Sequence, residues 1–351
     1  MFPREYRGVA VAVLLFLLVQ LGALMLVPSF NQQGLETVND TSNPTNSVIY
    51  IGAVLIATVL FLTAFKYDLD WVVRIVIVGT SGMLSWYVFN VIAPAGLAGV
   101  LAAGVTVALW VYPEWYVVDT TGVLMGASAA GLFGITFNLL PAVVLLSVLA
   151  VYDAISVYKT EHMLDLADGV MDLRIPVILV IPLTLSYSLL EDVGGDNDGG
   201  NADSNDTNAG STDNDNGNVD NDNTDRGVNE VNSDDNSDPS GSDITPEDER
   251  EAFFIGLGDA VIPTVMVASA ANPDFSLAPQ YTVPIIELNT PALGALVGTL
   301  AGLLVLMSMV MKGKPHAGLP LLNGGAIGGY LLGALSVGIP LVEALGLNGF
   351  L

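Results

Sequence analysis

The sequence contains no cysteine, and only 13% of its residues are charged. The absence of cysteine excludes disulfides, thiolate metal sites and cysteine nucleophiles. Only two histidines are present, His162 and His316, and neither belongs to an H-E-x-x-H run of the kind that binds catalytic zinc. The sequence therefore predicts no metal site and no cofactor.

Hydrophobic residues make up 52% of the 351 positions, and the mean hydropathy is +0.59. Several uncharged runs reach the ~20 residues that a helix needs to cross a bilayer. The chain is therefore predicted to be an all-α membrane protein with nine transmembrane helices. These helices are expected at 8–28, 47–65, 71–92, 94–112, 119–136, 138–158, 251–271, 291–311 and 318–345.

The net charge of −26 is concentrated in one segment, 191–250, which consists mainly of Asp, Asn, Gly, Ser and Thr. It has almost nothing to bury and no calcium-loop motif, so we expect a disordered acidic loop between helices six and seven. This loop divides the chain into an N-terminal membrane part, 1–190, and a C-terminal membrane part, 251–351. An acidic loop with so few lysines indicates a halophilic source.

Two further pieces precede the acidic loop. Residues 161–173 form an amphipathic pattern that is expected to lie along the membrane interface as a helix. Residues 175–190 are apolar but are interrupted by Pro176 and Pro182, and they are short for a spanning helix. This second piece is expected to be re-entrant or packed on the protein.

The basic residues indicate the orientation, because Lys and Arg favour the cytoplasmic side of short loops. With nine helices and a cytoplasmic N-terminus, all ten Lys and Arg residues fall on the cytoplasmic side. They are Arg4, Arg7, Lys66, Arg74, Lys159, Arg174, Arg226, Arg250, Lys312 and Lys314. We therefore predict a multi-pass protein of the cell membrane, with a cytoplasmic acidic loop and an outside C-terminus.

Two carboxylates lie inside predicted membrane helices. Asp153 is about five residues from the inner end of helix six, and Asp259 is about eight residues from the inner start of helix seven. A charge within a membrane helix costs at least ~2.5–3.5 kcal/mol, so each needs a partner or a function. Because the two helices are antiparallel, similar depths allow the two side chains to face each other.

The residues around Asp259 favour a close approach of the two carboxylates. Gly256 and Gly258 lack side chains and would allow the backbones to approach closely. Pro263 cannot donate the hydrogen bond that the carbonyl of Asp259 would accept in a regular helix, so a kink or loosened turn is expected there. The carboxylates Glu114 and Asp119 flank the predicted loop between helices four and five and are expected in solvent.

Two carboxylates a few ångströms apart in a poorly solvated site cannot both be ionised. One then serves as a base and the other as an acid, which is the arrangement that hydrolyses a peptide bond through an activated water. The same pair could instead line the pathway of a cation channel or a proton-coupled transporter. Composition and depth favour the two alternatives equally.

Three short motifs follow one another along the chain. Tyr152-Asp153 lies in helix six, Gly256-Leu257-Gly258-Asp259 in helix seven, and Ala317-Gly318-Leu319-Pro320 opens helix nine. Together they resemble the presenilin and signal peptide peptidase family of intramembrane aspartyl proteases, whose marks are YD, GxGD and a PAL or PALP motif. The stretch from Tyr152 to Met163 is similar to the archaeal presenilin homologues in particular.

The resemblance implies that Asp153 and Asp259 are catalytic and that they hydrolyse peptide bonds within transmembrane segments. The motif positions implied to shape the site or bind substrate are Tyr152, Gly256, Leu257, Gly258, Ala317, Gly318, Leu319 and Pro320. An unwound substrate would pair as an added strand with the exposed backbone at Gly318. The chain departs from the family at the PAL position, where it has Ala317-Gly318-Leu319.

The implied partners are transmembrane proteins or peptides as substrates, together with membrane lipid and without nucleic acid. The oligomeric state is open. A cytoplasmic N-terminus matches the presenilin orientation, which is opposite to that of signal peptide peptidases, and would place the cut near the cytoplasmic face.

Overall fold

The computed structural model describes residues 4–159, 178–182, 252–311 and 317–347, apart from positions 37, 39, 68, 277 and 284–285. The predicted interfacial helix at 161–173 and the predicted acidic loop at 191–250 lie outside the described residues.

The described chain consists mainly of helices, with two small antiparallel sheets. The helices are α1 (Arg4–Gln33), α2 (Thr45–Lys66), α3 (Asp70–Ile92), α4 (Ala95–Val111), α5 (Trp115–Thr136), α6 (Leu139–Lys159), α9 (Leu257–Ala271), α10 (Thr290–Val310), α11 (Gly318–Ser336) and α12 (Leu341–Ala344). The strands are β1 (Ile178–Pro182), β2 (Ala252–Gly256), β3 (Tyr281–Val283) and β4 (Ile286–Leu288).

Seven of the described helices are long and apolar enough to cross a membrane. Two further helices, α4 and α9, are apolar but shorter, with 17 and 15 residues. The mostly helical membrane architecture predicted from the sequence is therefore confirmed. The count of nine spans stays a prediction, because length and composition alone do not assign the two shorter helices.

The helix predicted at 251–271 begins only at Leu257, because Ala252–Gly256 forms strand β2. This strand pairs antiparallel with Ile178–Pro182, which belongs to the apolar piece expected to be re-entrant. The strand is favoured by β-branched and aromatic residues in both partners, such as Ile178, Val180 and Phe253. Residue Gly256 then ends the strand and is the N-cap of α9.

The predicted ninth helix, 318–345, is also shorter than expected. Helix α11 ends at Ser336, and Gly338 follows with a φ of 83°, a left-handed conformation that a glycine adopts without strain. Pro340 then precedes the short helix α12. The hydroxyl of Tyr330 donates a hydrogen bond of 2.6 Å to the carbonyl of Ala344, which holds α12 against α11.

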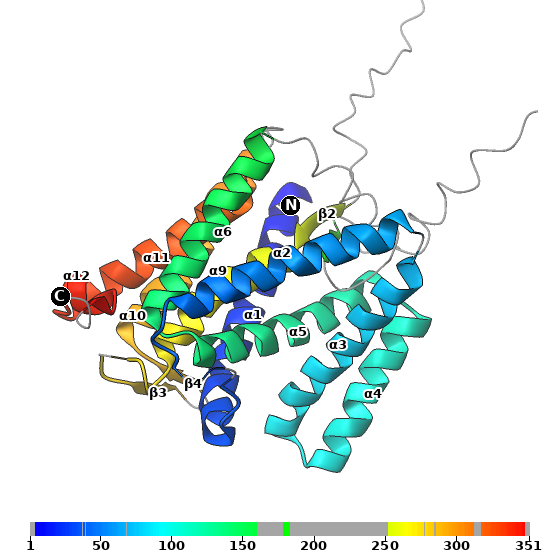
Figure 1. Cartoon of the computed structure of the whole chain (residues 1–351), viewed down its shortest axis with the longest axis horizontal. Helices are drawn as coiled ribbons and strands as arrows, with labels where there is room; N and C mark the ends of the chain where they lie inside the picture. Colours follow the sequence, from blue (N-terminus) through cyan, green and yellow to red (C-terminus); the bar gives the residue numbers. More distant parts are fainter. Residues whose placement is uncertain are drawn as a thin grey trace, which may run out of the picture.

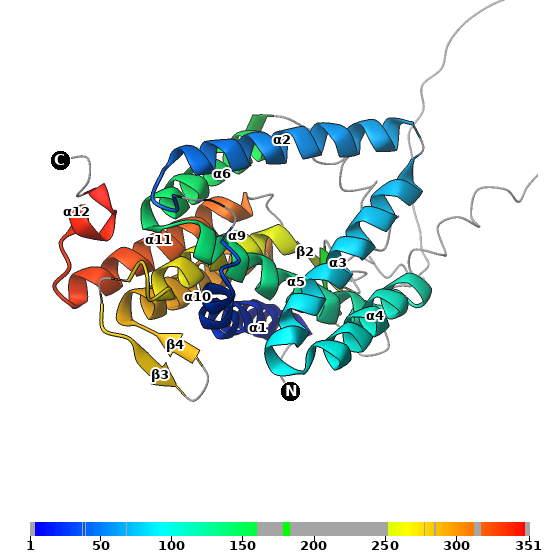
Figure 2. The same ribbon diagram turned by 60° about the horizontal axis from the view of Figure 1, so that its bottom comes forward.

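Helices α1, α5 and α9 occupy the centre of the bundle (Figures 1 and 2). Helices α6, α10 and α11 lie on one side of this centre, and the antiparallel pair α3 and α4 lies on the other (Figures 1 and 2). Helix α2 runs along the outside and contacts α3 and α6. The three sequence motifs therefore lie on the central helix α9 and on α6 and α11 beside it.

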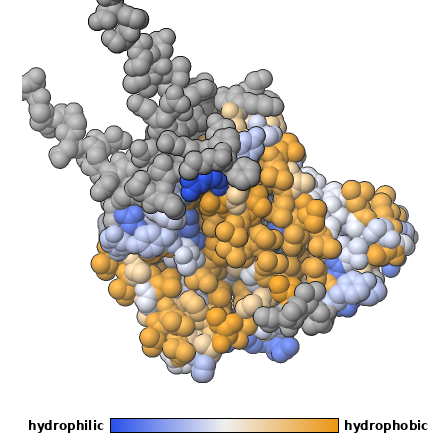
Figure 3. Space-filling model, turned by 180° about the vertical axis from the view of Figure 1, so that it is seen from behind, coloured by the Kyte–Doolittle hydropathy of each residue, from blue (hydrophilic) through white to orange (hydrophobic). Residues whose placement is uncertain are grey.

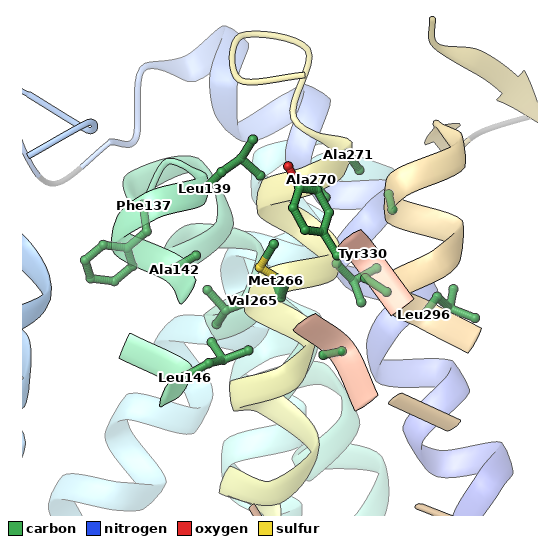
Figure 4. Packing of buried hydrophobic residues seen from close by; sticks show 14 of the residues in the cluster. Phe137, Leu139, Ala142, Leu146, Val265, Met266, Ala270, Ala271, Leu296 and Tyr330 are labelled. Carbon is green, nitrogen blue, oxygen red and sulfur yellow. The ribbon is translucent and has the colours of Figure 1, made fainter. Parts of the chain in front are cut away.

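The main core lies between α6, α9 and α11. Met266 and Val267 of α9 are fully buried, and Figure 4 shows α9 with side chains of α6 and α11 beside it, among them Leu146 and Tyr330. A helix that is buried on most of its surface and only 15 residues long is held by its neighbours rather than by lipid.

Large apolar side chains cover much of the outer surface, as one face shows in Figure 3. On α2, for example, Val48, Ile56 and Val59 are all more than 60% exposed. Continuous apolar surface of this extent is unfavourable in water and suits contact with lipid.

Helices α10 and α11 contact each other through glycines at four-residue spacing. The glycines are Gly294, Gly298 and Gly302 on α10, and Gly325, Gly329 and Gly333 on α11. A Cβ atom at Gly298 would overlap with the carbonyl oxygen of Gly325, so the two backbones touch directly. Small residues allow this approach, which membrane helices use because lipid supplies no hydrophobic drive between them.

We expect Gly298→Ala to lower the free energy of unfolding by about 1–3 kcal/mol, because the added methyl group forces α10 away from α11. Gly324→Ala, on the exposed face of α11, is the matched control, since a Cβ atom there meets nothing within 4 Å. Thermal unfolding of the purified variants in detergent measures both effects. Equal melting temperatures for the two variants would show that the glycine contact is not needed.

Candidate active site

Asp153 lies in the last two turns of α6 and is half-buried. Its Oδ2 accepts a hydrogen bond of 3.0 Å from the backbone N–H of Leu319. Leu319 is the second residue of α11, and the first N–H groups of a helix have no partner within the helix. The carboxylate of α6 therefore binds the free amino end of α11.

Asp259 is the third residue of α9 and is also half-buried. The predicted position eight residues into a helix is wrong, because strand β2 replaces the first part of that helix. The first turn of a helix favours negative charge, since its N–H groups point toward its beginning. A Cβ atom at Gly256 would lie 3.6 Å from Oδ2 of Asp259, and one at Gly318 would lie 3.5 Å from the same oxygen.

The start of α11 therefore contacts both carboxylates through successive residues, Gly318 beside Asp259 and Leu319 on Asp153. Asp153 is also close enough to act electrostatically on Asp259. Helices α6, α9 and α11 all pack against one another. The structure thus brings the key residues of the three sequence motifs to one place.

The other motif residues differ in their surroundings. Tyr152 is 54% exposed on α6, and Leu257 is buried in a cluster with residues of α1. The close approach expected at Gly258 is not seen, because a Cβ atom there would meet nothing within 4 Å. Ala317 is buried just before α11, and Pro320 is the third residue of that helix, where its missing N–H leaves no helical hydrogen bond unmade.

Glu114 and Asp119 were expected in solvent, and this expectation is wrong. Each is only 6% exposed. Helix α5 begins at Trp115, so Asp119 lies inside it, and its Oδ1 accepts a hydrogen bond of 2.7 Å from the N–H of Val180 in β1. The mostly β-branched run at 177–181, between Pro176 and Pro182, would have predicted a strand here, but not which helix it contacts.

The described residues contain no group of three or more His, Cys, Asp or Glu side chains placed to hold a metal ion. What they do place together is a pair of carboxylates beside the amino end of a helix. Such a pair can exchange protons with water and with a carbonyl group, as acid–base hydrolysis requires.

The protein-family model described as signal-peptide peptidase, presenilin aspartyl protease matches residues 13–339. The chain belongs to this family. Two solved structures of a presenilin family intramembrane aspartate protease, in space groups C222 and P2, are similar to it. The first is 28% identical, with 93% of this chain and 99% of that chain covered and a TM-score of 0.59. The second is 29% identical, with coverages of 92% and 96% and a TM-score of 0.53.

No protein with a curated description matches the sequence. Membership of the signal-peptide peptidase and presenilin family makes the chain an intramembrane aspartyl protease with transmembrane substrates, and its apolar helices make it a multi-pass membrane protein. The family resemblance and the hydrolase activity predicted from the motifs are confirmed. The channel or transporter alternative gains no support, and the halophilic archaeal source stays a prediction.

We expect Gly318→Ala, which creates the alanine of the family's PAL motif, to keep substrate cleavage within about threefold, because its Cβ atom would make ordinary contacts of 3.4 Å or more. Gly318→Leu should reduce cleavage by at least about 10²-fold, since its branched end must displace Asp259 or Leu306. Initial rates on a reconstituted transmembrane peptide measure both. Wild-type rates for Gly318→Leu would contradict the contact between α11 and Asp259.

Proposed function

We propose that Asp153 and Asp259 are the catalytic pair with which this protease hydrolyses peptide bonds inside transmembrane segments. The observation that carries the proposal is the start of α11, where Leu319 binds Asp153 and Gly318 lies against Asp259. Both carboxylates are half-buried rather than enclosed, so a substrate and a water molecule can reach them.

The two carboxylates share one proton, because two negative charges so close together in a poorly solvated site repel each other strongly. The ionised carboxylate takes a proton from water as the water oxygen bonds to the scissile carbonyl carbon. The protonated carboxylate donates its proton to the carbonyl oxygen, which gives a tetrahedral diol. A proton then passes to the amide nitrogen, the C–N bond breaks, and a carboxylic acid and an amine leave.

The substrate must be unwound before its backbone can reach this pair, and strand β2 offers a place for the unwound segment. The N–H of Val180 points to α5, so Val180 and its partner Phe254 form a non-hydrogen-bonded pair. The backbone groups of Phe254 therefore face away from β1, along an edge that leads to Gly256 and Asp259 and that is free of other strands in the described part of the chain. This edge replaces the backbone at Gly318 as the pairing site, because the neighbouring Leu319 N–H already binds Asp153.

We infer that the catalytic end of the bundle faces the cytoplasm, with the N-terminus and the 191–250 loop on that side and the C-terminus outside. The start of α1, the junction of α2 and α3, and the end of α6 all lie at the upper side of Figure 1. Arg7, Lys66, Arg74 and Lys159 belong to these ends. Clustering of basic residues on one side supports a cytoplasmic placement and hence a cut near that face.

We expect Asp153→Asn and Asp259→Asn each to reduce cleavage of a reconstituted transmembrane peptide by at least about 10²-fold, because an amide can neither take nor give the required proton. Asp274→Asn, the same change at an exposed position beyond the other end of α9, is the control and should leave cleavage unchanged. Thermal unfolding shows whether each variant folds. Cleavage at the wild-type rate by the double variant would overturn the proposal.

We expect Phe254→Pro to raise KM about fivefold or more, because it removes one N–H donor of about 1 kcal/mol from the free edge of β2. The pairing of β2 with β1 should survive, since that N–H faces away from β1. Phe254→Ala controls for the lost side chain and should cleave like the wild type. Equal KM values for Phe254→Pro and Phe254→Ala would show that the substrate does not pair with this edge.

A further inference from the structure

Asp119 is a buried carboxylate that the proposed mechanism does not use. It lies in α5, is 6% exposed, and accepts a hydrogen bond of 2.7 Å from the N–H of Val180. Burying a carboxylate among membrane helices is unfavourable unless the group is bonded to a donor. The donor here belongs to strand β1, which is distant in sequence and has no helical hydrogen bonds of its own.

Val180 is the central residue of β1, and its strand lies between two layers of helices. Leu179 and Ile181 on one face pack with Phe16 and other residues of α1. Val180 on the other face packs with Val118 of α5 and with residues of α3 and α4. Only one edge of β1 is paired with β2, so without Asp119 the N–H of Val180 would be a buried donor lacking an acceptor.

A displacement of β1 would be transmitted directly to the proposed active site. All five residues of β1 pair with β2, and Ile178 pairs with Gly256, the N-cap of α9. Asp259 follows three residues later, in the first turn of α9. Since β2 is joined to α9 without a linker, a shift of the sheet moves the start of α9 and with it the carboxylate of Asp259.

We propose that Asp119 is a positioning residue, which anchors β1 through the N–H of Val180 and thereby fixes the sheet that sets the place of Asp259 and of the free edge of β2. This role rests on the proposed function of Asp259. It requires an acceptor oxygen at position 119 but neither a charge nor a transferable proton. A third catalytic carboxylate would need the charge or the proton. The Asp119→Asn variant, which keeps the acceptor oxygen but neither of these, therefore distinguishes the two roles.

The first experiment does not depend on activity. Amide hydrogen exchange of the purified full chain in detergent, followed by mass spectrometry, reports on the peptides that contain β1 and β2. Asp119→Val should speed exchange in these peptides by about tenfold or more, the factor that corresponds to losing one hydrogen bond of a buried donor. Asp119→Asn should exchange like the wild type, because its Oδ1 accepts the same bond. The neighbouring exposed Thr120→Val is the matched control.

The second experiment removes the same hydrogen bond from its other end. Val180→Pro lacks the N–H, so it should lower kcat for a reconstituted transmembrane peptide about tenfold, as should Asp119→Val. If both substitutions act by removing the same hydrogen bond, the double variant should lose no more activity than the less active of the two single variants. Asp119→Asn should restore kcat to within about threefold of the wild type, as a pure acceptor role requires.

The outcomes distinguish the alternatives. An unchanged rate of amide hydrogen exchange in Asp119→Val overturns the anchoring role. An Asp119→Asn variant that is as inactive as Asp119→Val, while β1 and β2 exchange as in the wild type, also overturns it, since that result assigns Asp119 to proton chemistry. If Asp119→Val does not fold, Val180→Pro and Asp119→Asn still decide the question. If exchange responds as expected but the wild type cleaves no transmembrane peptide, the anchor stands and the proposed function fails.

Discussion

A carboxylate inside an apolar helix bundle has to be supplied with hydrogen-bond donors, and this constraint organises the end of the molecule where the proposed catalytic pair lies. The donors come from backbone N–H groups that regular secondary structure leaves free. Asp153 takes the N–H of Leu319 at the start of α11, and Asp119 takes the N–H of Val180 at the edge of β1. Asp259 lies in the first turn of its own helix. Asp153 and Asp119 therefore each join two elements that are distant in the sequence.

These contacts between distant elements require helices that approach each other more closely than large side chains would permit. The glycine faces of α10 and α11 bring their backbones into contact, which fixes the line along which α11 reaches the carboxylates. In the centre, a Cβ atom at Gly134 of α5 would overlap with Ala268 of α9, so these two helices are equally close. Small residues thus set the spacing of the bundle, because packing, rather than exclusion of water, holds helices together in lipid.

The small sheet of β1 and β2 packs between helices of the bundle and leads directly to the proposed catalytic residue Asp259. Its inner residues fill the gap between α1 and the α3 to α5 layer, whereas the outer edge of β2 pairs with no other strand among the described residues. An apolar site strengthens electrostatic interactions but also makes the unfolding of a substrate helix unfavourable, since exposed peptide groups need partners there. A strand edge that leads to Asp259 supplies such partners beside the group proposed to cut.

The sequence by itself determined the class of this protein and pointed to the two residues that are proposed to be catalytic. Apolar runs of membrane length are long enough to be read without tertiary information, and the three motifs around Asp153, Asp259 and Leu319 are local patterns of a few residues. Only the tertiary structure decided how they meet. Strand β2 replaced the start of a predicted helix, because an apolar segment such as Ala252–Gly256 favours either form until a partner strand is present. Asp119 changed from a residue expected in solvent to a buried acceptor for the same reason, since its donor lies 61 positions away in the sequence and contacts it only in the folded chain.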